Sequence, residues 1–248
     1  MIHDFSITET QVIFMDLPVV FDLDRAMTGQ MPYQWDDDYG ARVGVMPRGV
    51  DGADVQWFDV DPCYVFHPLN SFDRQGADGA EVVVDTARYN ELWRADSSDF
   101  RDEAHLHRWT LNLATGSVHE EALDDRSIEF PRCDERMVGS SNRYGYAVSN
   151  DASGPESNSA IIRYDLETGA SSAHDFGSAA IAGEPVMVPA SDDAAEDDGY
   201  LMSIVYDKAS DRSNLVILDA ADVAAEPVAT VHLPVRVPFG FHGSWLAD

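Results

Sequence analysis

The chain has 248 residues, of which 45 are Asp or Glu and 16 are Lys or Arg, so its formal net charge is −29. A charge of this sign repels phosphate groups, which argues against nucleic-acid binding through a basic patch and against electrostatic docking on an anionic membrane. Hydrophobic residue types make up 44% of the chain, enough for a packed core, which excludes wholesale disorder.

The two cysteines, Cys63 and Cys133, are too few for a disulfide framework. The first residues, MIHDFSITETQ, contain neither the basic region nor the apolar region of a signal peptide. No apolar run approaches the roughly 18–20 residues that a membrane-spanning helix requires. We therefore predict a cytoplasmic location.

In chain order, short apolar or alternating runs bounded by Gly, Pro, Asp or Asn predict strands joined by turns. These runs are Gln11–Phe14, Arg42–Met46, Val55–Phe58, Tyr64–Phe66, Glu81–Val84, Tyr144–Val148, Ala160–Tyr164, Tyr200–Tyr206 and Asn214–Leu218. A short helical turn is predicted within Asp85–Asp102, and exposed loops at Ser191–Asp198 and Asp219–Glu226. The pattern indicates an all-β fold.

An internal repeat divides the chain. The segments RWTLNLATG and RYDLETG both resemble a strand that ends in a tight Thr-Gly turn, and their leucines, Leu113 and Leu166, are 53 residues apart. A further step of 52 residues reaches Leu218, and a step of 53 residues backward reaches Val60. A four-stranded propeller blade takes roughly 40–50 residues. The repeat predicts four β-rich units, either a small closed ring or part of a larger propeller.

Four polar residues follow the repeat markers and fall where the first strand of each next blade would begin: His67, Glu129, Glu184 and His242. Because the first strand of a blade lines the propeller axis, these four side chains are expected to converge around one axial point. Like His67 and His242, His3 of the IHDF segment has an aromatic residue within two positions. A histidine N–H or a metal ion would relieve the cost of a carboxylate among apolar neighbours. From the pattern alone, ordinary core histidines and an axial metal site stay open as alternatives.

Seven segments, in order along the chain, resemble the carotenoid cleavage oxygenase family, which includes apocarotenoid and lignostilbene dioxygenases and the retinal-pigment-epithelium isomerohydrolase. They are Met1–Thr10 (MIHDFSITET), Trp57–Phe72 (WFDVDPCYVFHPLNSF), Ile128–Arg132 (IEFPR), Arg143–Tyr146 (RYGY), Gly183–Val188 (GEPVMV), Glu196–Val205 (EDDGYLMSIV) and Val237–Trp245 (VPFGFHGSW).

The resemblance implies a seven-bladed β-propeller with a non-haem Fe(II) ion held by four histidines. By motif, His3, His67 and His242 match three of these ligands. Glu129 and Glu184 match two of the glutamates that orient the ligand histidines, and we expect Glu129 to pair with His67 and Glu184 with His242. Aromatic residues near these motifs are expected around the metal or the substrate tunnel, although core packing explains them equally well: Phe66, Phe239, Phe241 and Trp245.

The family's remaining histidine ligand lies upstream of the HDF motif, which here begins the chain. The resemblance therefore implies a single partial propeller domain over residues 1–248, of about four to five blades, and an N-terminal half that is missing.

The implied activity is that of an Fe(II)-dependent dioxygenase, which cleaves a conjugated carbon–carbon double bond of a carotenoid, apocarotenoid or stilbene-like substrate into two carbonyl products. O2 and an apolar conjugated molecule are the implied partners, and family members also contact membranes peripherally. The alternative is a catalytically inactive propeller fragment or binding module that lacks the fourth iron ligand. A sugar-binding or hydrolytic propeller would require paired axial carboxylates without these histidines.

Overall fold

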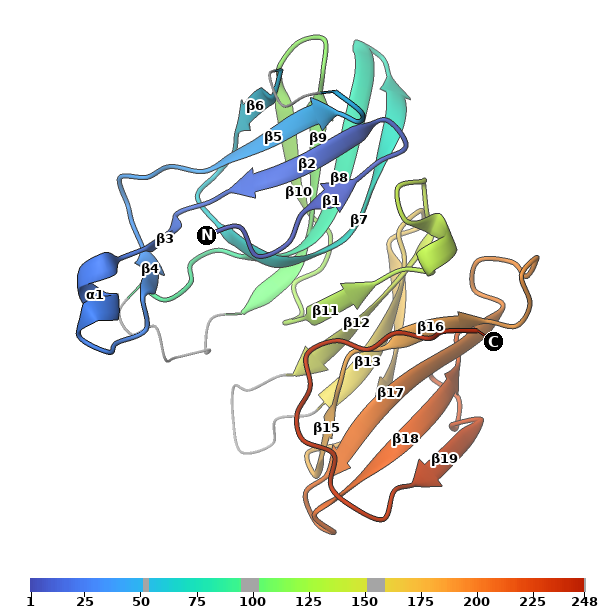
Figure 1. The fold of residues 1–248 in the computed structure, drawn as a ribbon. Coiled ribbons are helices and arrows are strands. Elements are labelled where there is room, and N and C mark those ends of the chain that lie inside the picture. Colours follow the sequence, from blue (N-terminus) through green and yellow to red (C-terminus); the bar gives the residue numbers. More distant parts are fainter. Residues whose placement is uncertain (51–53, 95–102, 151–158, 248) are drawn as a thin grey trace. The chain divides into compact units, whose positions relative to one another are not determined.

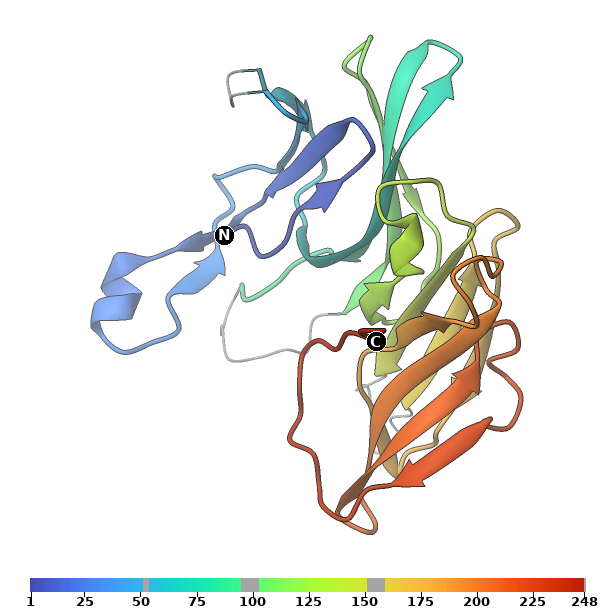
Figure 2. The ribbon, with the colours of Figure 1, turned by 45° about the vertical axis from the view of Figure 1, so that its right-hand side comes forward.

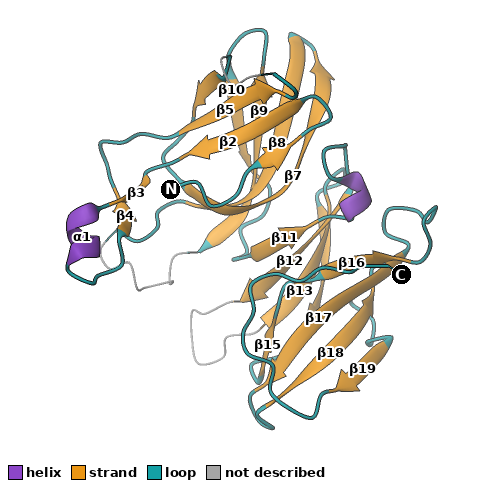
Figure 3. Ribbon diagram, in the orientation of Figure 1, coloured by secondary structure: helices purple, strands orange, loops and turns teal. Residues whose placement is uncertain are grey.

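The computed structural model describes residues 1–50, 54–94, 103–150 and 159–247 (Figure 1). Regular structure in these residues is almost entirely β, apart from the five-residue helix α1 (Leu23–Met27) and a 3-10 turn, Glu135–Met137 (Figure 3). The chain forms two compact units: unit 1 contains residues 1–125 and 139–141, and unit 2 contains residues 126–138 and 142–248. The prediction of one domain over the whole chain stays a prediction.

The first sheet of unit 1 has the order β1-β2-β5-β6, and all its neighbours are antiparallel. Its strands are β1 (Ser6–Ile7), β2 (Gln11–Asp16), β5 (Arg42–Pro47) and β6 (Gln56–Asp59). Between β2 and β5 the chain leaves the sheet and forms the ribbon of β3 (Val19–Phe21) and β4 (Tyr33–Trp35). Helix α1 connects these two strands, and the Asp22 side chain caps it by accepting the Arg25 N–H at 3.1 Å. We call residues 19–35 the arm.

The second sheet of unit 1 is a meander of the order β10-β9-β8-β7. Its strands are β7 (Tyr64–Gly76), β8 (Gly79–Tyr89), β9 (Ala104–Asn112) and β10 (Val118–Ala122). Val82, Val83 and Val84 are fully buried, as is Asp85 directly after them. The Asp85 carboxylate faces Arg108 on β9 and accepts two hydrogen bonds from its guanidinium, at 2.6 and 2.7 Å. A bidentate ion pair of this kind compensates the buried negative charge of the carboxylate.

Unit 2 contains two further antiparallel sheets, which are seen from two sides in Figures 1 and 2. The third sheet consists of β11 (Glu129–Arg132), β12 (Tyr144–Asn150), β13 (Ser159–Asp165) and β14 (Ala170–Asp175). The fourth consists of β15 (Ala180–Ala182), β16 (Val186–Pro189), β17 (Gly199–Asp207), β18 (Arg212–Asp219) and β19 (Ala229–His232). Buried side chains from both sheets form one core, with Tyr146 and Ile161 on one side and Leu201 and Val216 on the other.

The predicted strands all lie within or overlap observed strands, and Ser191–Asp198 connects two strands as a loop, as predicted. The helical turn predicted within Asp85–Asp102 is wrong for its first part, because residues 85–89 complete β8 and pair with both neighbouring strands. Cross-strand pairing and burial outweigh a weak local helical preference here. Residues 95–102 of that prediction lie outside the described residues.

Two turns explain the repeat found in the sequence. Asn112 and Asp165 end the third strands of their sheets, and each side chain accepts hydrogen bonds from the N–H groups two and three residues ahead, at 2.9–3.2 Å. Gly116 and Gly169 close these turns with φ of +74° and +72°, a conformation that favours glycine.

The repeat markers do not all occupy the same place in their sheets. Leu113 and Leu166 directly follow third strands, and Leu218 lies at the end of β18, the third strand along the order of its sheet. Val60 instead follows the fourth strand of the first sheet, so the backward step of the repeat is wrong by one strand. The reason is the long interval between the end of β5 and Leu113, which contains β7 and β8, of 13 and 11 residues.

The first strand of the second sheet shifts its register against its neighbour twice, by one residue each time. Val65 pairs with Arg88, Pro68 with Thr86 and Asn70 with Asp85, so three steps and then two steps along β7 match two and then one along β8. Such an irregularity is a β-bulge, which bends a strand and redirects the side chains at the extra position.

The same one-residue shift occurs in the first strands of unit 2. On β11 it falls between Glu129 and Arg132, where three steps match two along β12. In the fourth sheet it falls between Ala182 at the end of β15 and Val186 at the start of β16, where four steps match three along β17. A proline lies within or at one end of each shifted interval in the three sheets, and proline has no N–H to donate to a ladder.

The buried pair of Asp85 and Arg108 provides a test of the second sheet. Arg108→Leu leaves a buried carboxylate uncompensated, and we expect the free energy of unfolding to fall by about 3–5 kcal/mol. The double variant Asp85→Leu/Arg108→Leu is expected to recover most of this loss. Urea unfolding followed by tryptophan fluorescence measures both.

The matched control is Arg74→Leu, since Arg74 pairs with Glu81 across β7 and β8 but is 45% exposed. Its loss is expected to cost less than about 1 kcal/mol. Equal losses of unfolding free energy for Arg74→Leu and Arg108→Leu would contradict the prediction that burial makes the pair of Asp85 and Arg108 more important for stability.

Candidate metal centre

His67 lies on β7 inside the first of its two shifted intervals. Side chains normally alternate between the two faces of a strand, but here Phe66 and His67 both contact the ring of His3. The ring centroids are 5.0 Å apart for His3 and Phe66 and 5.2 Å apart for His3 and His67, and both ring pairs are close to perpendicular. The bulge therefore accounts for how unit 1 brings two imidazoles together.

Aromatic side chains hold this part of unit 1 in place. Phe66 is 9% exposed and contacts the rings of Tyr64, Tyr89 and Trp93 edge-on, at centroid distances of 4.9–5.6 Å. The Tyr64 hydroxyl also donates to the carbonyl of Met1, two residues before His3, at 3.4 Å. Edge-to-face packing of this kind restricts ring orientation, so β7 presents His67 on a rigid support.

In unit 2, the side chain of His242 is anchored by Glu184, whose own side chain is only 4% exposed. Glu184 Oε1 lies 3.1 Å from Nδ1 of His242, and Glu184 Oε2 accepts the N–H of Gly243 at 2.7 Å. Arg132 Nη1 lies 3.1 Å from Glu184 Oε2 and compensates the buried negative charge. An ionised carboxylate can only accept hydrogen bonds, so this contact favours the tautomer of His242 with the proton on Nδ1.

This arrangement matches the way in which proteins orient histidine ligands of metal ions, where the second ring nitrogen donates to a carboxylate. Imidazole nitrogens suit Fe, Zn, Cu and Ni. The other predicted glutamate, Glu129, accepts the N–H of Phe130 at 2.7 Å. The roles of these residues as metal ligands and orienting groups, and the pairing of Glu129 with His67 of the other unit, stay predictions.

The aromatic residues predicted near the metal divide into two groups. Phe66 contacts His3 and His67 directly. Phe239 instead packs edge-on against Tyr206, with the Arg236 guanidinium 4.9 Å from the centre of its ring. Phe241 and Trp245 are 76% and 48% exposed.

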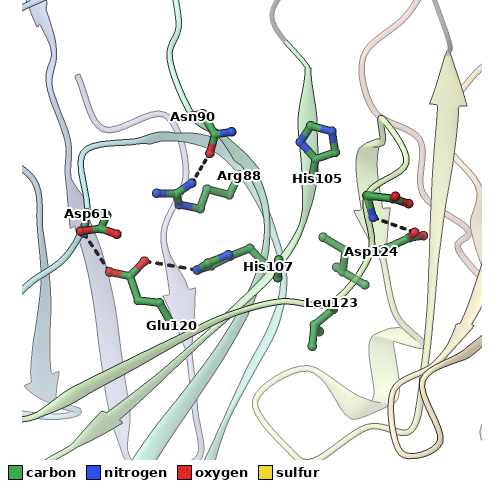
Figure 4. A pocket seen from close by; sticks show the side chains of 11 residues that line it. Asp61, Arg88, Asn90, His105, His107, Glu120, Leu123 and Asp124 are labelled. Atoms are coloured by element: carbon green, nitrogen blue, oxygen red, sulfur yellow. Dashed lines mark hydrogen bonds and ion pairs between the residues drawn. The ribbon is translucent and has the colours of Figure 1, made fainter.

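Unit 1 also contains a polar pocket of about 730 Å³, which the sequence analysis did not predict (Figure 4). Arg88 pairs with His105 across β8 and β9, so these two side chains share one face of the sheet, and His107 lies on that face two residues further along β9. Glu120 completes the group from β10. The signal in the sequence was the H-x-H alternation of a strand, which places both histidines on one side.

Hydrogen bonds fix Glu120 in this pocket. It accepts the N–H of Asp61 at 2.8 Å and the indole N–H of Trp109 at 2.9 Å, and it lies 3.3 Å from Nε2 of His107. Burial lowers the pKa of His107, and the nearby Arg88 charge lowers it further, while Glu120 acts in the opposite direction and is outweighed. His107 is therefore neutral at pH 7.

Both cysteines are buried free thiols. Burial raises the pKa of Cys63 and that of Cys133 to about 12, although Arg88 and Arg132 respectively oppose this effect. Because the thiolate is the nucleophile and the metal ligand, neither side chain is poised for such chemistry near pH 7.

Residues 1–247 match the model of the family described as retinal pigment epithelial membrane protein. The chain belongs to this family. A carotenoid cleavage oxygenase of Mycobacterium tuberculosis is 38% identical over 99% of this chain and 58% of its own length. Apocarotenoid-15,15'-oxygenase of Synechocystis is 35% identical over 98% of this chain and 51% of its own length. The chain thus spans about half the length of the curated relatives that it matches.

Solved structures of this family agree with the fold. Cobalt-substituted Synechocystis ACO superimposes with a TM-score of 0.89 at 33% identity, over 100% of this chain and 53% of that one. A chimera of ACO and RPE65 gives a TM-score of 0.87 at 32% identity. The predicted fold class, a partial β-propeller of the carotenoid-oxygenase type, is therefore confirmed over about half of the solved chains, and the described residues form four sheets of four or more strands. Among these residues there is no helix with the length and apolar character needed to cross a bilayer.

The lowered pKa of His107 predicts a pH dependence of stability. The unfolded histidine titrates near about pH 6.5, above the folded value, so the unfolded state takes up the proton first as the pH falls. The contribution of the neutral His107 to the free energy of unfolding is therefore fully present above about pH 6.5, and the free energy of unfolding decreases below that pH. We expect His107→Gln to flatten this decrease between about pH 6.5 and 5, measured by urea unfolding at a series of pH values.

His119→Gln is the control, because His119 lies exposed on the adjacent strand β10. It should reproduce the pH dependence of the unsubstituted chain. A His107→Gln curve parallel to that of the control would contradict the assignment.

Proposed function

We propose that this chain supplies three histidine ligands, His3, His67 and His242, to a non-haem Fe(II) centre. The complete protein would be a dioxygenase that cleaves a conjugated carbon–carbon double bond of a carotenoid, apocarotenoid or stilbene-like substrate. The observation that carries the proposal is the hydrogen bond between His242 Nδ1 and the buried Glu184 carboxylate, the arrangement by which proteins orient histidine ligands of metal ions. The names of relatives along the whole chain, carotenoid cleavage oxygenase and apocarotenoid oxygenase among them, support the substrate class.

The donor set supports the choice of metal. Neutral imidazoles suit Fe(II), but they do not compensate its positive charge. Carboxylates that accept a hydrogen bond from the ligand histidines offset this charge and raise the basicity of the ligands. Glu184 is placed to do this for His242. We propose the corresponding role for Glu129 toward His67.

The side chains around the histidines orient the ligands and exclude water, and bound Fe(II) would supply the activation of O2. Glu184 holds the proton on Nδ1 of His242, and the packed rings around Phe66 restrict solvent at the base of His67. In the overall reaction the double bond is broken and each of its carbons receives one atom of O2, so two carbonyl products form without a further reductant. No nicotinamide, flavin or 2-oxoacid is required.

A second function is favoured by one observation, the coverage of about half of each relative. A fragment with three histidine ligands would bind iron more weakly than a set of four, and the chain would then be an inactive propeller fragment or a binding module. Metal content distinguishes the two functions.

For the metal test, the 248-residue chain is loaded anaerobically with Fe(II), desalted and analysed for iron by mass spectrometry. We expect close to one iron per chain, and a loss of at least about tenfold in His67→Ala and in His242→Ala, because each variant removes a ligand. The control His119→Ala, at an exposed histidine, should bind iron as the unsubstituted chain does. Iron retained by both ligand variants would overturn the ligand assignment, and no iron in any form would favour the inactive fragment.

We also propose that the arm contacts a membrane from which an apolar substrate is taken. Phe21, Leu23 and Met27 are 56%, 63% and 79% exposed and lie together on β3 and α1. Exposed apolar residues gathered on one projecting element are typical of an interaction site. The overall negative charge predicts that neutral lipid is preferred over anionic lipid.

The membrane test is flotation with phosphatidylcholine vesicles. We expect Leu23→Asp/Met27→Asp to reduce the bound fraction at least about fivefold, because charged side chains on this element oppose insertion. Val231→Asp, at an exposed position of β19, should leave the bound fraction unchanged. Equal flotation of the arm variant and the unsubstituted chain would exclude the arm as the contact.

A further inference from the structure

His242 lies in a segment without regular secondary structure that follows β19. Its side chain is 51% exposed, so neither a strand ladder nor core packing fixes the direction of its ring. The orientation of the ring depends on the contacts that other elements of unit 2 make with it. They include contacts with Glu184 and with residues of the short strand β11.

The first contact comes from Phe130, which adopts a backbone conformation rare for its type. Its φ is +51°, in the left-handed region, although it is a bulky residue and directly precedes Pro131. Residues before proline favour extended conformations, and bulky residues are unfavourable at positive φ. Such a conformation persists only where the surroundings enforce it, and it marks functional sites more often than ordinary strands.

The unusual backbone brings the ring of Phe130 against His242. The ring centroids are 5.7 Å apart at an interplanar angle of 81°, which is an edge-to-face contact. The carboxylate of Glu129 accepts the Phe130 N–H at 2.7 Å, so the N–H released from the ladder by the bulge still has a partner. Strain, hydrogen bond and ring contact therefore coincide at one residue.

The second contact comes from Arg132, on the other side of Pro131. Its Nη1 lies 3.3 Å from the carbonyl oxygen of Gly243 and 3.1 Å from Glu184 Oε2. Arg132 thus holds both the main chain directly after His242 and the carboxylate that binds His242 Nδ1. Its other terminal nitrogen pairs with Glu135, which fixes the guanidinium plane.

We propose that Phe130 and Arg132 are positioning residues for His242: Phe130 sets the plane of the imidazole ring, and Arg132 sets the Glu184 carboxylate and the main chain behind it. The inference rests on the proposed function insofar as His242 binds a metal ion. Neither residue touches the metal or the substrate in this role. Both act through His242, and the strained bulge of β11 is the element that carries them.

The test uses the 248-residue chain with Co²⁺ as the probe, followed by calorimetry and by the visible absorption of bound cobalt. Phe130→Leu keeps an apolar side chain but removes the ring, and we expect Co²⁺ to bind about tenfold more weakly with an altered absorption spectrum. Phe130→Tyr keeps the ring edge and should restore both. Arg132→Lys keeps the charge but cannot hold both partners at once, so its affinity should also fall.

The control is Phe176→Leu. Phe176 makes the same kind of edge-to-face contact with a histidine, His174, at a centroid distance of 4.7 Å in the same unit. It is far along the chain from β11 and should change neither affinity nor spectrum. Thermal unfolding of every variant separates a loss of folding from a loss of positioning.

A second readout needs no metal. Nitrogen-15 spectra of the histidine rings at pH 8 should show His242 in a single tautomer with the proton on Nδ1, and Phe130→Leu or Arg132→Lys should shift this signal toward a mixture. Unchanged spectra and unchanged Co²⁺ affinity in both variants would overturn the positioning proposal.

The two proposals fail differently. If His242→Ala leaves Co²⁺ affinity unchanged, the ligand assignment fails, while the tautomer measurement still decides whether Phe130 and Arg132 position the ring. If His242→Ala abolishes binding but Phe130→Leu and Arg132→Lys behave as the unsubstituted chain, only the positioning proposal fails.

Discussion

The one-residue shifts in the first strands of three sheets are the constraint on which the candidate site depends. A strand in regular register sends alternate side chains to opposite faces. Two consecutive residues of such a strand therefore cannot both point toward the same site. Each shift frees one position from this rule, and the nearby proline removes an N–H that the broken ladder could not use. His67, Glu129 and Glu184 all lie in these intervals.

Two contacts between a glutamate and a histidine in this chain show how local surroundings decide what an imidazole can do. His242 turns Nδ1 to Glu184 and is half exposed. His107 turns Nε2 to Glu120 and is only 12% exposed, beside the positive charge of Arg88. The first arrangement is the one by which proteins orient histidine ligands of metal ions, whereas the second keeps a neutral ring inside a pocket. Residue type alone does not distinguish them.

The sequence was sufficient for the strands, because alternation and turn residues report directly on a half-buried sheet. The roles assigned to His67, Glu184 and His242 stay predictions. The helical turn predicted at the end of β8 was wrong, because a segment this short does not distinguish a helix from a strand by its sequence pattern. Pairing with β7 and β9 makes it a strand. The positive φ of Phe130 and the pocket of Arg88 and His105 could not be predicted. Both depend on which strands become neighbours, and the length of β7 and β8 likewise displaced the repeat marker at Val60.

The buried pair of Asp85 and Arg108 lies within a molecule whose formal charge is −29. Dissolved ions reach the surface carboxylates and shorten the range of their mutual repulsion from ~10 Å at 0.1 M to ~3 Å at 1 M ionic strength. They do not reach a carboxylate that is fully buried against its guanidinium. Rising ionic strength therefore weakens the repulsion among surface carboxylates, which opposes the compact state. It leaves the attraction between Asp85 and Arg108 intact. Concentrated salt solution is thus a favourable solvent for this fold.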